Sequence, residues 1–161
     1  MYKKAKIKTA LLYTFGALAV TIALGMIVFM VHTLRLRTEY RDFCLEINNA
    51  VLTSPKQRNT VTRGDETAPL SFTALNYYDQ FLLDTGTLVY SRKSAEPTEK
   101  SIVISMKGGT LSFIPLDEET ICLRWDTPSG TRSYRVRAGY ITFADLHSYL
   151  TIYLQSLSKE G

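Results

Sequence analysis

The sequence has little of what enzymes and metal proteins use most. It contains two cysteines, two histidines and one tryptophan in 161 residues. Neither Cys44 nor Cys122 belongs to a Cys-x-x-Cys pair, and neither histidine has a second ligand at metal-binding spacing. Nucleophile elbows, phosphate loops and dinucleotide fingerprints are missing too. We therefore expect no catalytic residue, cofactor or metal, and predict that the chain is not an enzyme.

The two cysteines leave one alternative open. An exported domain permits a disulfide between Cys44 and Cys122, whereas in a reducing compartment both act as small hydrophobic residues. Nothing in the sequence brings the two thiols together, so this disulfide is only a candidate.

Charge is absent from the longest apolar segment. From Ala10 to Val31 the polar residues are Tyr13, Thr14 and Thr21. Twenty-two helical residues rise about 33 Å, which matches a hydrocarbon core of about 30 Å. A signal peptide has a shorter apolar region that ends at small residues, whereas Ala17-Leu18-Ala19 lies in mid-segment. We predict an uncleaved signal-anchor helix over residues 10–32.

Basic residues flank this segment on both sides, and the net charge of +4 comes largely from them. The positive-inside rule compares Lys3, Lys4, Lys6 and Lys8 with Arg35, Arg37 and Arg41. The comparison favours a cytoplasmic tail at 1–9 and an extracytoplasmic C-terminal domain. This charge fits anionic lipid, so no nucleic-acid partner is expected.

Small residues recur within the predicted anchor. Ala17, Thr21 and Gly25 are four apart, which puts them on one helical face. Small side chains let a second helix approach closely, so these residues form a candidate helix–helix contact. The other interpretation is chance, because alanine and glycine are common in membrane helices.

No proline or glycine interrupts the chain between Gly25 and Pro55, so the helix is predicted to continue through 33–52 as a juxtamembrane helix. Its apolar stripe is formed by Leu36, Tyr40, Phe43, Ile47 and Ala50. The stripe packs either on a second helix or on the protein's own sheet. We favour the sheet, because the stripe is shorter than three heptads.

The remaining residues, 53–161, predict one extracytoplasmic α+β domain. A polar loop is expected over 53–69, followed by a short helix with Ser71 as N-cap, Asp84 as its last residue and Gly86 as its stop. A final helix is expected over 143–157, with Thr142 and Asp145 as its capping box. Strands are expected around 88–90, 102–106, 111–113, 121–126 and 133–137.

These strands predict a five-stranded antiparallel meander with the helices packed on one face. Gly108-Gly109 predicts a hairpin in which both glycines adopt positive φ. On the last hairpin Arg124, Arg135 and Arg137 alternate outward and form a candidate basic interaction face for an anionic polymer, a lipid headgroup or an acidic partner. The alternative is a solvated face that protects the sheet edge. Asp117, Glu118 and Glu119 are interpreted as a solvated turn.

The order of apolar helix, amphipathic helix, loop and meander resembles pilin-like secretion and competence subunits in outline. That family starts its apolar segment with Gly-Phe followed by a glutamate, whereas here Phe15-Gly16 is reversed and the segment holds no acid. The same outline resembles the membrane-anchored assembly factors of conjugation machines. Both are likenesses of the fold outline.

We therefore expect a single-pass, non-enzymatic interaction or assembly subunit of a cell-envelope complex. Its expected partners are the lipid bilayer and other membrane or envelope proteins, including further copies of itself. One alternative is a component of a pilin-like, secretion or conjugation machine. Another is an envelope domain that binds or converts a ligand, which predicts a polar pocket between sheet and helices.

Overall fold

A computed structural model describes residues 2–54, 59–84 and 86–160, with side chains from Tyr13 to Lys159. The chain forms two units, Met1–Thr38 and Glu39–Gly161, and each is described by itself. The side chains of Lys3, Lys4, Lys6 and Lys8, on which the predicted orientation depends, lie outside the described part.

Both units share one helix, α1 (Tyr2–Thr53), of 52 residues. The prediction that the apolar helix continues without a break to about Leu52 is confirmed. In the first unit, thirteen large apolar side chains between Tyr13 and Leu34 are exposed. Within the described part, this is the one helix long and apolar enough to cross a membrane.

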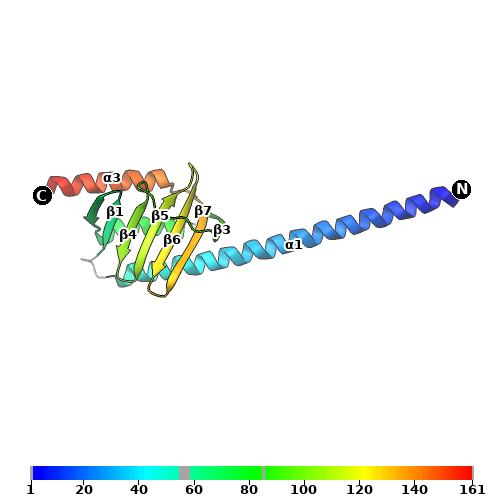
Figure 1. Cartoon of the computed structure of the whole chain (residues 1–161), viewed down its shortest axis with the longest axis horizontal. Helices are drawn as coiled ribbons and strands as arrows, with labels where there is room; N and C mark the ends of the chain where they lie inside the picture. The colour runs from blue at the N-terminus through cyan, green and yellow to red at the C-terminus, as the bar shows by residue number, and fades with distance from the viewer. Residues whose placement is uncertain (1, 55–58, 85, 161) are drawn as a thin grey trace. The chain divides into compact units, whose positions relative to one another are not determined.

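The second unit is an α+β domain built on one antiparallel sheet (Figure 1). The strand order is β2-β1-β4-β5-β6-β7-β3. The strands are β1 (Thr60–Arg63), β2 (Glu66–Pro69), β3 (Leu88–Ser91), β4 (Ile102–Met106), β5 (Gly109–Pro115), β6 (Thr120–Thr127) and β7 (Gly130–Arg137), and the helices after α1 are α2 (Phe72–Leu83) and α3 (Phe143–Glu160).

The described sheet has seven strands, so the predicted number of five was wrong. The segment expected to be a loop contains the hairpin β1–β2, which turns at Gly64 with φ +57°. Val61 in this hairpin is buried and pairs with Ile104, so the otherwise polar strand β1 contributes one apolar residue to the core. The strand β3 pairs with β7 at the far edge, so the meander itself consists of β4 to β7.

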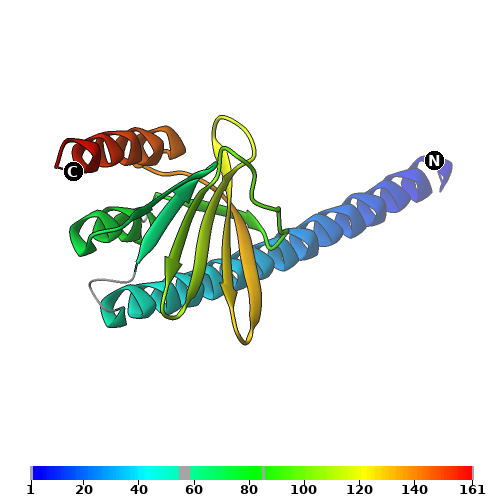
Figure 2. The same ribbon diagram turned by 60° about the vertical axis from the view of Figure 1, so that its left-hand side comes forward.

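The helices cover the inner face of the sheet, as predicted (Figure 2). Phe81 of α2 meets Phe113 of β5 at a ring-centroid distance of 5.6 Å. The Glu39–Thr53 part of α1 contacts β7 through Phe43 and Tyr134, whose ring centroids are 4.9 Å apart. The predicted stripe therefore packs on the protein's own sheet.

The helix starts follow from local capping. The Ser71 hydroxyl accepts a hydrogen bond from the Ala74 N–H at 3.2 Å. At the start of α3, the Asp145 carboxylate accepts from the Thr142 N–H at 2.8 Å, and the Thr142 hydroxyl accepts from the Asp145 N–H at 3.2 Å. Both predicted caps are confirmed. The helix α2 ends at Leu83 with Asp84 as its C-cap.

The outer face of the sheet is crossed by residues 92–100, which we call the strap. The strap leaves the edge strand β3 and leads to β4, passing over β6 and β7. Beneath or beside it, Ser112, Ile114 and Cys122 are buried although they point away from the helices. The strap therefore covers part of the outer face, over β6 and β7.

The glycines of the β4–β5 turn have a different role from the predicted one. Met106 pairs with Gly109, so the turn residues are Lys107 and Gly108, and neither glycine has positive φ. A Cβ on Gly109 would lie 2.4 Å from the Asp126 carbonyl oxygen and 3.0 Å from the Trp125 ring. Glycine is needed there because β5 and β6 approach closely.

Replacement of Gly109 by alanine is expected to destabilise the domain. The added methyl group overlaps backbone of β6, so the free energy of unfolding should fall by about 1–3 kcal/mol. Denaturant unfolding of the full chain in detergent micelles measures this change. The control is Lys107→Ala in the same exposed turn, and equal stability of both variants would contradict the account.

Candidate functional site

The predicted helix–helix contact lies on the apolar part of α1. The Thr21 hydroxyl donates to the Ala17 carbonyl oxygen at 2.9 Å, so it satisfies itself within its own helix. Gly25 has open space where a side chain would be, with nothing within 4 Å of its Cβ position. Ala17, Thr21 and Gly25 therefore present small side chains and no unsatisfied hydroxyl on one side of the helix.

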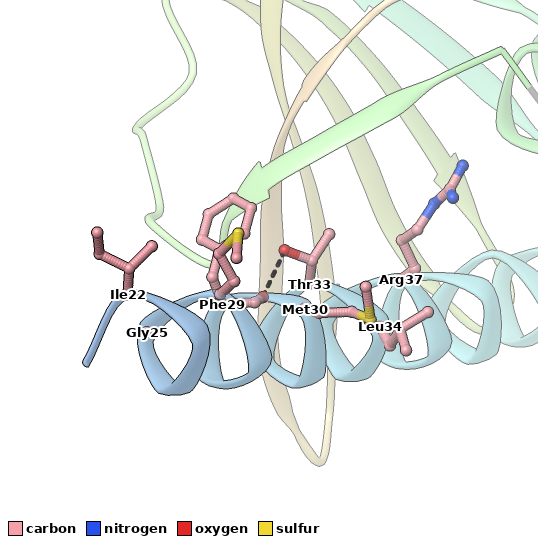
Figure 3. Close-up of a pocket in the computed structure, with 8 residues that line it drawn as sticks. Ile22, Gly25, Phe29, Met30, Thr33, Leu34 and Arg37 are labelled. Carbon is pink, nitrogen blue, oxygen red and sulfur yellow. Dashed lines mark hydrogen bonds between the residues drawn. The ribbon is translucent and has the colours of Figure 1, made fainter. Parts of the chain in front are cut away.

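Gly25 also lines a hollow on this helix, shown in Figure 3. Neighbouring walls are formed by larger side chains, including Ile22, Phe29 and Met30. The Thr33 hydroxyl donates to the Phe29 carbonyl oxygen at 2.9 Å, so the hollow is apolar along most of its length. Its form follows from a glycine set among bulky residues.

The predicted basic face is largely paired with acids. Arg124 forms ion pairs with Glu96 of the strap at 2.5 Å and with Asp126 at 2.9 Å. Arg137 forms one with Glu119 at 2.5 Å. Arg135 differs, because its Nε atom is buried and donates to none of the described residues. The three arginines share the outer face as expected, but their charge is partly offset within the chain.

The two cysteines are free thiols, and both are buried. Cys44 lies on α1 on the inner side of the sheet, near Tyr40 and Asp79. Cys122 points to the outer face, where its Sγ lies 3.7 Å from the Lys93 carbonyl oxygen of the strap. The sheet separates the two thiols, so the structure does not contain the candidate disulfide.

A polar group between α1 and α2 was missed by the sequence analysis. Asn48 Nδ2 donates to Asp79 Oδ2 at 2.7 Å, and Asp79 is buried. Burial raises the pKa of the Asp79 carboxyl, and the hydrogen bond from Asn48 opposes this rise. Asp79 occupies a helix face that is otherwise apolar, and this break in the pattern was the available signal.

Cys44 is not suited to nucleophilic chemistry. Burial raises the pKa of its thiol to about 12, so it stays protonated at neutral pH. The neighbouring Tyr40 hydroxyl is buried as well, and burial raises its pKa. Tyr40, Cys44, Asn48 and Asp79 therefore form a polar strip inside the domain core.

A polar groove lies at the β7 side of the sheet, with a volume of about 440 Å³. Arg92 forms an ion pair with Glu39 across it, and Arg132 forms one with Glu46. The groove residues are Glu39, Asp42, Arg92, Thr131, Arg132, Ser133 and Tyr134. The groove carries both signs of charge, and its two arginines are paired with acids.

The three consecutive acids form a turn. Asp117 Oδ1 accepts from the backbone N–H groups of Glu119 at 3.0 Å and Thr120 at 2.7 Å. These hydrogen bonds lower the pKa of the Asp117 carboxyl. Within the described residues, no group of three or more histidine, cysteine or acidic side chains is placed to hold a metal ion.

No protein-family model, curated protein or solved structure matches this chain.

Replacement of Asp79 by asparagine is expected to stabilise the domain at neutral pH. The raised pKa means that the folded state binds the proton of Asp79 more tightly than the unfolded state does. The resulting stabilisation of the fold is complete in acid and is lost as the pH rises. An amide carries no charge to bury. The gain in unfolding free energy should be largest at neutral pH and shrink towards about pH 4.

The contrasting variant is Asp145→Asn. Hydrogen bonds from Thr142 lower the pKa of the Asp145 carboxyl. The ionised carboxylate therefore stabilises the fold at neutral pH, and this stabilisation is lost as the pH falls. This variant should lose stability at neutral pH and approach the unchanged protein in acid. If the unfolding free energies of the two variants changed with pH in the same direction, the environments assigned to Asp79 and Asp145 would be contradicted.

Proposed function

We propose that the chain is a single-pass, membrane-anchored, non-enzymatic interaction subunit of a cell-envelope complex. The observation that carries the proposal is the difference in side-chain exposure between the two parts of α1. Its N-terminal part exposes large apolar side chains, which favours lipid or another apolar helix as its surroundings. Its C-terminal part is buried in the core of the domain.

The same helix belongs to both units of the chain. The apolar segment passes into the core segment without a proline or glycine after Gly25, so no helix-breaking residue separates them. The residues proposed to contact lipid therefore lie on the same element as residues that pack in the domain core.

The partner in the membrane is proposed to be a second helix, from another copy or from another envelope protein. Ala17, Thr21 and Gly25 supply the close-approach surface, and the hydroxyl of Thr21 is already satisfied. We place the N-terminus in the cytoplasm and the domain outside, on the basis of the lysines before the span.

A component of a pilin-like, secretion or conjugation machine is the alternative within the same class. It is supported by the long helix α1, whose second half packs on an antiparallel sheet. This support is an analogy of architecture. An envelope ligand-binding or enzymatic domain is the alternative of another class, and the polar groove beside Arg92 and Tyr134 favours it.

Substitution of Gly25 by leucine tests the membrane contact. The added side chain fills the close-approach surface, so crosslinked complexes recovered from membranes should fall sharply. The control is Val20→Leu, which lies about 140° away around the helix. If crosslinking recovers only the monomer from the unchanged chain, the interaction proposal is wrong.

A cysteine at Ser129 tests the orientation. Ser129 is exposed in the β6–β7 turn, whereas Cys44 and Cys122 are buried and provide an internal background. A membrane-impermeant maleimide should label Ser129→Cys in intact cells. Labelling that requires permeabilised cells would place the domain in the cytoplasm.

A further inference from the structure

The strap makes few stabilising contacts with the sheet. Residues 92–100 form neither helix nor strand, and nearly all of them are exposed. The exposed side chains are polar or charged except for Pro97, so apolar burial contributes little to their attachment. The strap is therefore held mainly by polar contacts.

Apart from the ion pair of Arg92 with Glu39 of α1, most of these contacts come from side chains of the outer face and reach the strap's backbone. The Ser133 hydroxyl lies 3.4 Å from the Arg92 carbonyl oxygen, and the Cys122 thiol lies 3.7 Å from that of Lys93. Arg124 Nη1 donates to the Ala95 carbonyl oxygen at 3.4 Å. Every residue has a backbone carbonyl oxygen, so these donors can bind any extended segment, whatever its side chains.

One side-chain contact adds a preference for an acid. Glu96 pairs with Arg124 at 2.5 Å, although the Glu96 side chain is 81% exposed and that of Arg124 is 18% exposed. Asp126 holds Arg124 from its own strand at 2.9 Å, so the guanidinium stays oriented without the strap. Such a half-exposed pair contributes little to stability and is readily exchanged for another carboxylate.

A spare donor lies on the same face. Arg135 pairs in register with Cys122, and its buried Nε donates to none of the described residues. The strap therefore leaves part of the hydrogen-bonding capacity of this surface unused. A buried donor without an acceptor lowers stability, and a ligand that supplied the acceptor would recover that loss.

We infer that the outer face of β6 and β7 is a docking surface for an extended segment of a partner protein that carries a carboxylate where the strap carries Glu96, and that the strap occupies it in cis. Ser133, Cys122 and Arg124 hold the carbonyl oxygens of the segment, and Arg124 holds its carboxylate. The inference rests on the proposed function, because it names the partner chemistry of an interaction subunit.

The two native thiols report opening of the strap. Cys122 lies beneath the strap and Cys44 lies in the helical core, so strap opening exposes the first and not the second. In the full chain in detergent micelles, a maleimide should label Cys122 faster than Cys44. The variant Glu96→Ala should raise the Cys122 rate by about two- to fivefold and leave the Cys44 rate unchanged.

The matched control is Glu99→Ala, which removes another strap carboxylate that is not paired with Arg124. It should leave both rates unchanged. Equal labelling of Cys122 and Cys44 in every variant would mean that the strap opens only when the whole domain unfolds. That result would overturn the inference.

Binding is tested with a fluorescent peptide that copies residues 91–99. It should bind the Glu96→Ala chain about two- to fivefold more tightly than the unchanged chain, because the competing strap is weakened. A peptide with glutamine at the position of Glu96 should bind the Glu96→Ala chain more weakly than the unchanged peptide does, because it lacks the carboxylate that pairs with Arg124. Lack of saturable binding, or equal binding of both peptides, would overturn the inference.

The proposed function is judged separately. If the peptide fails to bind while Gly25→Leu still lowers membrane crosslinking, the chain remains an interaction subunit without this docking surface. If the peptide binds and crosslinking recovers only monomer, the docking surface stands and the membrane contact does not.

Discussion

The packing of the Glu39–Thr53 part of α1 on the inner face of the sheet is the interaction on which the domain depends. Phe43 is fully buried between Tyr40, Tyr134 and the guanidinium of Arg132, whose carbon lies 5.6 Å from the Phe43 ring. One turn later Glu46 accepts a hydrogen bond from Trp125 Nε1 at 3.0 Å. These contacts join the helix to β6 and β7, the two longest strands.

This arrangement gives the helix two roles. Its first half exposes a continuous apolar surface, and its second half provides core residues such as Ile47 and Val51. Loss of the second half would leave the inner face of the sheet without one of its helical covers. In the proposed function, the anchor and the fold of the domain are therefore parts of the same element.

The outer face follows a different principle. Two of its arginines, Arg124 and Arg137, pair with acids from the strap and from the turn before β6, so part of the charge is offset within the chain. The strap covers buried Cys122 with backbone and exposed polar side chains. A cover held by exchangeable polar contacts differs from the apolar helical cover on the inner face, and this contrast motivates the docking proposal.

Much of the fold could be predicted from the sequence, because uninterrupted apolar periodicity identified α1, and the serine and threonine caps identified the starts of α2 and α3. The hairpin β1–β2 could not, because its strands are short and polar and gain their stability from the pairing of Val61 with Ile104. The edge position of β3 depends on pairing with β7, which is distant in sequence. The ion pairs of Arg124 and Arg137 and the polar contact of Asn48 with Asp79 also join distant segments.

The central claim is that the second half of α1 is a core element of the domain. Native-state hydrogen exchange of the full chain in detergent micelles measures this most directly. The amides of Tyr40 to Val51 should exchange as slowly as those of β6, through global unfolding. Exchange of these amides many times faster than in β6 would show that the helix detaches from the sheet, and would contradict the account.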